Sequence, residues 1–306
     1  MSSQPAIALD GLTKRFGDRA AVDAVTAEIP RGAVAGFIGP NGAGKTTTMA
    51  MLLGLIAPTA GAGLVLGESL GTPGRYMHRV GALLESPALW PGLTGRQNLR
   101  VLAKLGRHNA GRIPEVLTLV GLADRADDRF GRYSLGMRQR LGIAAALLGD
   151  PELVILDEPT NGLDPAGIRE MRRLIKTIAG QARTVLISSH ILSELEHICD
   201  WLIVIDGGRV MYTGPAAGFV SHATRITLTP LRTADLSALA DVVAGRELRF
   251  ELDGERIVVH IDGAEPRAMA ADVIRAALLG GVDLTEVRIE RPTLETTYLD
   301  RLEAIA

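Results

Sequence analysis

One short glycine-rich segment has the residue types that hold a phosphate group. Residues 39–46 read GPNGAGKT and match the pattern G-x-x-x-x-G-K-[ST] in full. Its glycines allow successive backbone N–H groups to turn toward phosphate oxygens, and the helix that follows adds its positive end. The lysine is expected to reach the β- and γ-phosphates, and Thr46 to bind Mg²⁺. The candidate nucleotide-binding residues here are Gly39, Pro40, Asn41, Gly42, Ala43, Gly44, Lys45, Thr46 and Thr47.

A second segment places two acids at the end of an aliphatic run. Residues 153–156 read LVIL, which is typical of a central parallel strand buried on both faces, and Asp157 and Glu158 follow directly. Asp157 is expected to hold Mg²⁺ through water. Glu158 is placed to activate an attacking water as a general base. A solvated turn is the alternative, but a buried strand normally avoids charge at its tip.

The elements that position these residues predict an α/β fold with a parallel sheet. An apolar run over 33–38, the glycine loop and a helix over 45–56 form a strand–loop–helix unit. Further strands are expected at 6–9, 24–29, 79–84, 184–188 and 201–206, and helices over 165–179 and 191–199. Gly207-Gly208 predicts a hairpin into 209–213. We therefore expect a P-loop NTPase with a parallel-sheet core, an antiparallel β subdomain and an inserted helical subdomain at about residues 86–150, where Thr94 and Gln97 match a capping box.

The pattern changes after about residue 219. A strand is predicted over 224–229, a hairpin over 248–261 with Asp253-Gly254 at its turn, and a helix over 267–279. A strand over 282–289 and a helix over 293–302 complete a small C-terminal α+β domain. The sequence thus predicts a nucleotide-binding domain over residues 1–220 and an accessory domain over residues 221–306.

Composition narrows the class of protein. The 306 residues carry 33 basic and 35 acidic side chains, a formal net charge of −2, which argues against a nucleic-acid partner held by bulk charge. A single cysteine, Cys199, excludes an intramolecular disulfide, fits a reducing cytosolic setting and is expected to pack in the core. Residues 46–67 form a stretch of 22 residues without charge, long enough for a membrane span. Pro58 and the phosphate loop favour a short buried helix, a turn and a strand instead.

Residues 133–140, between the two chemical segments, read YSLGMRQR and lead into a helix. At this point the sequence resembles the ABC-type ATPases, whose signature is close to LSGGQ. Ser134 and Gly136 match its serine and second glycine; Tyr133, Leu135 and Met137 differ, in a form familiar among drug- and antibiotic-exporting members. The resemblance covers residues 5–220, and the tail over 291–299 also resembles this exporter branch. It implies that Ser134 and Gly136 meet the γ-phosphate bound by a second subunit.

Other elements of the family follow in the expected order. By this resemblance Phe16 stacks on adenine, Asp164 belongs to the D-loop that crosses the dimer interface, and His190 contacts the γ-phosphate. Glu85 takes the place of a glutamine that links Mg²⁺ to the membrane partner, and a glutamate there recurs in the bacitracin-resistance and lantibiotic-immunity branch. Glu85 is therefore either a functional metal ligand or a tolerated near-isostere. Trp90 either anchors a partner or packs internally.

The resemblance implies the ATP-binding and ATP-hydrolysing subunit of an ABC transporter, with ATP and Mg²⁺ at its site. Glu158, His190 and Lys45 would carry catalysis. The implied partners are integral-membrane permease subunits and a second copy in a head-to-tail dimer, at the cytoplasmic face of a bacterial membrane. The implied cargo is an antibiotic, a lantibiotic or another drug-like molecule for export. The alternative is an ABC-type ATPase in regulation or repair, although the long coiled-coil insertion of repair members is not visible in the sequence.

Overall fold

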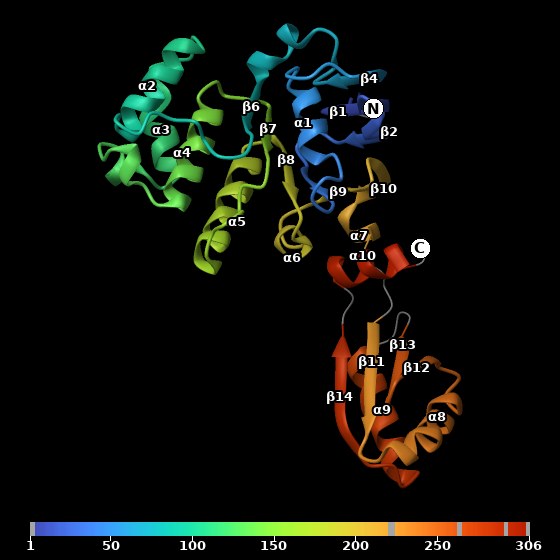
Figure 1. Ribbon diagram of the computed structural model, residues 1–306. Coiled ribbons are helices and arrows are strands. Elements are labelled where there is room, and N and C mark those ends of the chain that lie inside the picture. Colours follow the sequence, from blue (N-terminus) through green and yellow to red (C-terminus); the bar gives the residue numbers. More distant parts are fainter. Residues whose placement is uncertain (1–3, 220–223, 262–264, 291–292, 304–306) are drawn as a thin grey trace. The chain divides into compact units, whose positions relative to one another are not determined.

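The computed structural model describes residues 4–219, 224–261, 265–290 and 293–303, with the side chains of 299–303 excepted. The chain divides into two compact units, Met1–Ala217 and Gly218–Ala306, which we call the N-terminal unit and the C-terminal unit. Figure 1 shows the elements of both. The expected domain boundary between residues 220 and 221 lies outside the described residues, as do Arg291 and Pro292 of the tail resemblance.

A six-stranded sheet forms the centre of the N-terminal unit. Its strand order is β10-β9-β3-β8-β7-β6, and all neighbours are parallel except β10 and β9. The strands β3, β7 and β8 are buried along their whole length, as expected for a sheet covered on both faces. The strands are β3 (Val34–Ile38), β6 (Val80–Leu83), β7 (Leu153–Leu156), β8 (Thr184–Ser189), β9 (Trp201–Asp206) and β10 (Arg209–Pro215).

A second, antiparallel sheet of the N-terminal unit has the order β2-β1-β4-β5. Its strands are β1 (Ile7–Phe16), β2 (Arg19–Ile29), β4 (Ala60–Val65) and β5 (Glu68–Ser69). The first two are longer than predicted. The register between them shifts three times, and Gly11 has a positive φ of 59°, so the apolar alternation that marks a strand is broken. The two strands nevertheless remain paired up to the tip of the hairpin, where Phe16 pairs with Arg19.

Two helices next to the site are shorter than predicted. Helix α1 (Lys45–Leu52) ends before residue 56 because Gly54, with φ +66°, turns the chain out of the helix. Helix α6 (Leu192–Leu195) ends well before residue 199, and Ile198 and Cys199 stay buried in the turns that follow. Helix α5 (Pro165–Ala179) has the predicted bounds.

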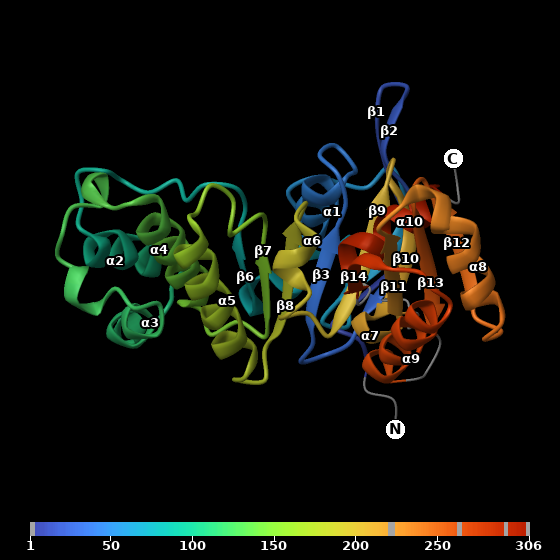
Figure 2. The same cartoon turned by 90° about the horizontal axis from the view of Figure 1, so that it is seen from below.

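An inserted group of helices separates β6 from β7 in the sequence. It consists of α2 (Gly95–Leu105), α3 (Ile113–Leu119) and α4 (Leu135–Leu147). Thr94 and Gln97 form both bonds of the predicted capping box at the start of α2. Figures 1 and 2 show these helices together on one side of the unit, away from β1 and β2. Short 3₁₀ turns cover Pro73–Arg75, Met77–Arg79, Ala110–Arg112, Ala123–Arg125 and Phe130–Arg132, and α7 (Ala216–Phe219) follows β10.

The C-terminal unit is a four-stranded antiparallel sheet with two helices on one face. Its sheet order is β12-β13-β11-β14, and the chain order β-α-β-β-α-β makes it a split βαβ, or ferredoxin-like, fold. The elements are β11 (Thr224–Pro230), a 3₁₀ turn (Thr233–Asp235), α8 (Leu236–Ala244), β12 (Arg249–Asp253), β13 (Arg256–Ile261), α9 (Pro266–Leu279), β14 (Leu284–Glu290) and α10 (Leu294–Glu303).

Two details of the C-terminal unit differ from the sequence prediction. Helix α8 was not predicted; its Leu239 and Val243 are fully buried against the sheet. The hairpin turn is Gly254-Glu255 rather than Asp253-Gly254, because Asp253 pairs with Arg256 across the last rung. The predicted α/β fold class is confirmed. Among the helices that the structure describes, none is long and apolar enough to cross a membrane, so the uncharged stretch over 46–67 is not a spanning helix.

Candidate nucleotide-binding site

The glycine loop lies at the carboxyl end of β3 and leads directly into α1. Gly44 has φ +104°, and a Cβ there would lie 2.4 Å from the carbonyl oxygen of Ala21, so only glycine fits. A Cβ on Gly39 would lie 2.2 Å from the carbonyl oxygen of Ile205. In contrast, the space in front of Gly42 is open, with the Arg19 guanidinium 3.9 Å from a Cβ placed there. The loop is therefore packed tightly from behind and open on the side where N–H groups can meet an anion.

Lys45, the first residue of α1, is only 6% exposed. Its Nζ donates to the carbonyl oxygens of Gly39 at 2.7 Å and Pro40 at 3.2 Å. The same Nζ lies 3.4 Å from Oε1 of Glu158. The carbonyl oxygens of the loop thus hold the ammonium over the loop, where it faces Glu158, the second acid after β7.

The carboxyl ends of β7 and β8 meet at Asp157. Its Oδ2 accepts a hydrogen bond from the Thr46 hydroxyl at 2.8 Å, and its Oδ1 accepts one from the Ser188 hydroxyl. The Ser188 hydroxyl also accepts from the backbone N–H of Glu158 at 2.8 Å. Ser188 therefore links the two acids. Its role was not predicted, although the parallel register of β7 and β8 brings it to the tip of β7.

Glu158 and His190 contact each other directly. The His190 Nδ1 and the Glu158 Oε2 are 2.8 Å apart, and a proton on Nδ1 makes the ring the donor. Glu158 has φ +49°, a left-handed conformation that costs a non-glycine residue roughly 1–2 kcal/mol. Strained residues of this kind cluster at functional sites. The backbone turn at residue 158 aims the carboxylate at both Lys45 and His190.

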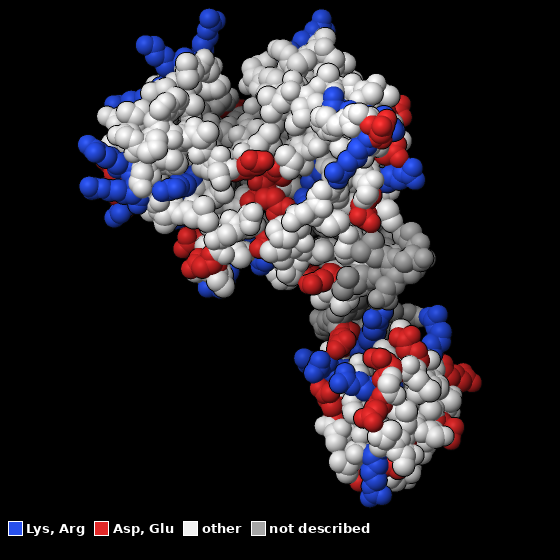
Figure 3. Space-filling model, in the orientation of Figure 1, with Lys and Arg blue, Asp and Glu red and all other residues white. Residues whose placement is uncertain are grey.

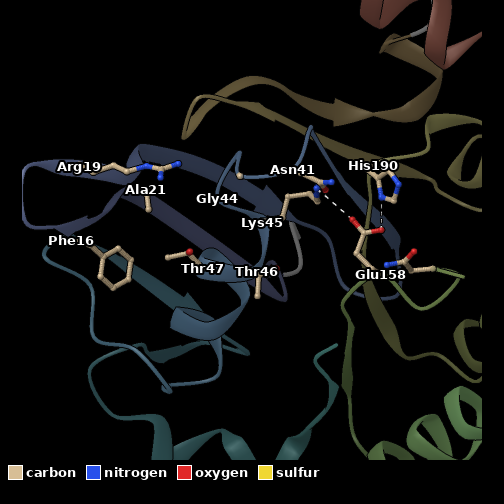
Figure 4. Close-up of a pocket in the computed structure, with 12 residues that line it drawn as sticks. Phe16, Arg19, Ala21, Asn41, Gly44, Lys45, Thr46, Thr47, Glu158 and His190 are labelled. Atoms are coloured by element: carbon tan, nitrogen blue, oxygen red, sulfur yellow. Dashed lines mark hydrogen bonds and ion pairs between the residues drawn. The ribbon is translucent and has the colours of Figure 1, made fainter. Parts of the chain in front are cut away.

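These residues enclose a pocket of about 550 Å³ (Figure 4). Of the predicted residues, Asn41, Gly42, Gly44, Lys45, Thr46, Thr47, Glu158 and His190 line it, and Phe16 stands at its far end from Glu158. Phe16 is 53% exposed, and the Lys14 ammonium lies 5.1 Å from its ring centroid. The ammonium lies over one face of the ring, and about half of the side chain is open to solvent. Gly39, Pro40 and Ala43 complete the loop without lining the pocket.

Arg19, Ala21 and Asn161 also line this pocket and were not predicted. Figure 4 shows Arg19 on the wall between Phe16 and the glycine loop. The sequence did contain a signal for Arg19. The turn at residues 17 and 18 reverses the chain, so Arg19 lies opposite Phe16. A guanidinium at this position suits phosphate oxygens.

Three predicted residues lie in a separate pocket of about 390 Å³. Ser134, Gly136 and Asp164 line it together. The Ser134 hydroxyl accepts from the Met137 N–H at 3.3 Å and caps α4, and Asp164 caps α5 by accepting from the Gly167 N–H at 2.8 Å. The two helix N-termini present positive ends toward this pocket. The structure therefore does not bring these residues to the Lys45 pocket within one chain.

Glu85 lines a third hollow, of about 280 Å³, together with Thr46, Asp157 and Glu158. Its side chain is exposed and its φ is +54°. The Gln139 side chain also lines this hollow, and its Oε1 is buried without a hydrogen-bond partner. In the part of the chain that the structure describes, no group of three or more His, Cys, Asp or Glu side chains could hold a metal ion.

Cys199 and Trp90 lie outside the site. Cys199 is 8% exposed, and burial raises the pKa of its thiol well above the usual range, so it acts as a core residue. Trp90 is 45% exposed, and its backbone N–H and carbonyl pair with the side chain of Asn98.

Comparisons with known proteins identify the family of this chain. The sequence pattern of the ABC transporter family matches residues 22–161. An ABC transporter ATP-binding protein of Bacillus subtilis, YcbN, is 37% identical over 298 residues, covering 95% of this chain and 94% of its own length. This chain belongs to the ABC transporter ATP-binding family. The chain is also 49% identical over 203 residues to the bacitracin transport ATP-binding protein BcrA of Bacillus licheniformis, covering 65% of this chain and 66% of that protein.

A lantibiotic transport ATP-binding protein of Streptococcus pyogenes, SrtF, is 40% identical over 203 residues, covering 66% of this chain and 88% of its own length. A solved ATP-binding subunit of an ABC transporter superposes with a TM-score of 0.63 at 30% identity, covering 70% of this chain and 91% of that one. The family and the ABC ATP-binding domain are therefore established. The expected resemblance to bacitracin and lantibiotic transport ATP-binding proteins is confirmed.

Proposed function

We propose that this ABC protein hydrolyses ATP at the pocket between the glycine loop and β7. The observation that carries the proposal is the convergence of Lys45 and His190 on the carboxylate of Glu158, 3.4 and 2.8 Å away. A phosphate cradle, a buried cation and an oriented carboxylate are the parts that phosphoryl transfer to water requires. The glycine loop and Lys45 would hold the β- and γ-phosphates, and Phe16 would stack on the adenine.

Thr46 and Asp157, whose oxygens already meet at 2.8 Å, would hold Mg²⁺, and Glu85 lines the same hollow. When bound, the ion would neutralise charge on the phosphate oxygens. Glu158 would take a proton from the attacking water, and His190 would orient the carboxylate and contact the γ-phosphate. Ser188 would keep Asp157 and Glu158 in register.

We propose further that two copies act as a head-to-tail dimer. Ser134, Gly136 and Asp164 form an anion-binding surface that lies apart from Lys45 on the same chain. In a head-to-tail pair this surface would close over the pocket of the partner. ATP binding would then favour the closed dimer, and hydrolysis would reopen it.

The relatives favour transport over a regulatory or repair role. Proteins named for bacitracin transport and for lantibiotic transport are 49% and 40% identical to this chain. We propose that the chain drives export of an antibiotic, a lantibiotic or a similar molecule through separate permease subunits, at the cytoplasmic face of a bacterial membrane. The proposed function does not involve a nucleic-acid partner.

The test is Glu158→Gln in the full chain, expressed together with its permease subunits. General-base removal typically costs about 10²–10⁴ in rate. The variant should bind ATP, hydrolyse it slowly, accumulate as a dimer in size exclusion with ATP, and lose protection against the exported antibiotic. A Glu158→Gln protein that turns over ATP normally and remains monomeric would contradict the proposal. Normal ATPase kinetics of the wild type without any change in drug susceptibility would contradict the transport part alone.

A further inference from the structure

A buried carboxylate lies behind the candidate site and has no part in the function proposed above. Glu194 belongs to α6, four residues after His190, and is only 5% exposed. Burying a carboxylate is costly unless a donor satisfies it. The donor here is the hydroxyl of Thr160, itself 8% exposed, which bonds to the Glu194 Oε2. A buried charged group that needs such a partner calls for an explanation beyond packing.

The two partners belong to the two segments that carry Glu158 and His190. Thr160 follows Glu158 by two residues, and the intervening chain is a tight turn in which the Asn161 N–H donates to the Glu158 carbonyl at 3.1 Å. On the other side, the Glu194 N–H donates to the carbonyl of Ile191, the residue next to His190, at 3.2 Å. Each segment is therefore stiffened locally. A shift of Thr160 or Glu194 is transmitted to the neighbouring catalytic candidate.

The backbone does not hold these two segments together. The ladder between β7 and β8 ends at the pair Leu156 and Ile187, before either segment begins. Beyond it, the hydrogen bonds that join the two segments in the described structure involve side chains: Ser188 to Asp157 and Glu158, His190 to Glu158, and Thr160 to Glu194. All but the last lie at the site itself, and the last is buried behind it. The position of α6 is further fixed by Arg172 of α5, which donates to the Ser193 carbonyl at 3.0 Å.

We infer that Glu194 is a positioning residue: through its bond to Thr160 it holds His190 against Glu158 in the geometry that hydrolysis needs. The inference rests on the roles proposed above for Glu158 and His190. It assigns to Glu194 no contact with the nucleotide. Its loss should therefore lower kcat and leave ATP affinity almost unchanged.

The decisive variants are Thr160→Val and Glu194→Ala in the full chain. Thr160→Val keeps the side-chain shape and removes the donor. Misplacing a catalytic group, or removing the partner that orients it, costs about 10- to 100-fold. We expect that loss in kcat for both variants, with the ATP dissociation constant changed by less than about threefold because both residues lie behind the pocket.

Conservative variants distinguish a role in positioning His190 from a role in stability alone. Thr160→Ser keeps the hydroxyl and Glu194→Gln keeps an acceptor oxygen, so both should retain most of the wild-type kcat. The Thr160→Val/Glu194→Ala double variant should be no slower than the slower single variant, because all three variants lose the same hydrogen bond. Tyr76→Phe is the matched control: its buried hydroxyl donates to the Leu52 carbonyl at 2.9 Å, away from the pocket, and its loss should lower stability without lowering kcat.

Three results would overturn the inference: wild-type kcat in folded Thr160→Val and Glu194→Ala, an equal loss in Thr160→Ser and Glu194→Gln, or additive losses in the double variant. If Glu194→Ala fails to fold, Thr160→Val decides. Glu158→Gln measured alongside keeps the two proposals apart. A slow Glu158→Gln with normal Thr160→Val overturns only the positioning role, whereas an active Glu158→Gln overturns the proposed function.

Discussion

The two units of this protein use buried polar side chains very differently. The buried charged residues of the described chain are all in the N-terminal unit: Lys45, Asp157, Arg183 and Glu194. In the described part of the C-terminal unit the buried polar residues are threonines: Thr224, Thr227 and Thr297. Because an ionised group is costly to bury, a concentration of such groups marks the place where a structure serves more than its own stability.

Of the seven non-glycine residues with a positive φ in the described part of the N-terminal unit, two line the candidate site. Glu85 and Glu158 both have a positive φ, and both lie at the carboxyl end of a parallel strand next to Asp157. The described part of the C-terminal unit has one such non-glycine residue, Glu247, just after α8. Some charged groups of the C-terminal unit pair at its surface, as Arg288 does with Glu286 at 2.7 Å, and Figure 3 shows acidic and basic side chains intermingled there. The contrast favours chemistry in the N-terminal unit and an accessory role for the C-terminal unit.

The largest effect that tests this contrast is expected from Lys45→Ala. The variant loses a buried charge-assisted contact to phosphate, worth roughly 1.5–3 kcal/mol, so ATP affinity should fall about tenfold or more. Calorimetric titration of the full chain with ATP measures it. The control is Lys104→Ala, which removes an exposed lysine from α2. Equal ATP affinity in Lys45→Ala and wild type would place the nucleotide elsewhere.

Much of this site was predictable because its chemistry is local in sequence. The glycines of the loop at residues 39–46 favour its conformation, and the acids after residue 156 follow a run that is typical of a buried strand. The predicted site roles themselves remain proposals. What the sequence did not reveal depends on tertiary pairing. Arg19 enters the pocket through hairpin register, and Ser188 through the register of β7 and β8.

The prediction of the fold also succeeded where the sequence pattern is local. It failed where bulges, turns or tertiary packing interrupt that pattern. The strands with uniform apolar runs, such as β7, were found, whereas the parts of β1 and β2 next to their turn were missed because bulges break the alternation. Helix α8 was missed because it is short and largely apolar, so that its hydrophobic periodicity is weak, although Asp235 and Gly245 flank it at the usual cap positions. Helix ends at α1 and α6 were set by Gly54 and by packing of Ile198 and Cys199, which periodicity does not record.

A smaller effect is expected from Arg19→Ala. The guanidinium lines the pocket between Phe16 and the loop, but it is exposed, so a contact to a phosphate oxygen is weakened by solvent. We expect ATP affinity to fall about three- to fivefold, more at low salt than at high salt. Titration at two ionic strengths measures it. Arg15→Ala is the control, since the Arg15 guanidinium donates to the Asp18 carbonyl and does not line the pocket. Identical losses in both variants would reduce Arg19 to part of the general surface charge.

Glu85→Gln tests whether the second strained acid matters. A carboxylate at residue 85 attracts Mg²⁺ more strongly than an amide does, and it opposes ATP when the ion is absent. At an effective dielectric constant near that of water, one such charge is worth about 1 kcal/mol or less. The Mg²⁺ concentration for half-maximal ATPase activity should therefore rise by about two- to threefold, while nucleotide binding and folding change little.

The measurement is ATPase activity against Mg²⁺ concentration, with and without the permease, together with drug resistance. Glu68→Gln is the control, because Glu68 pairs with Arg75 and lies outside the pockets that contain Thr46. Matching curves and matching resistance for Glu85→Gln and wild type would leave Glu85 as a near-isostere that the site tolerates.

The smallest effect is expected from removing the C-terminal unit altogether. All twelve residues that line the Lys45 pocket belong to the N-terminal unit, which has its own apolar core. A fragment of residues 1–220 should therefore bind ATP with an affinity within about twofold of the full chain, because separate domains keep their own cores and fold independently. Titration of the fragment measures it, and Lys45→Ala in the same fragment must lose binding as it does in the full chain. A folded fragment that binds ATP as poorly as Lys45→Ala would show that the C-terminal unit completes the site, and the division between a chemical unit and an accessory unit would be wrong.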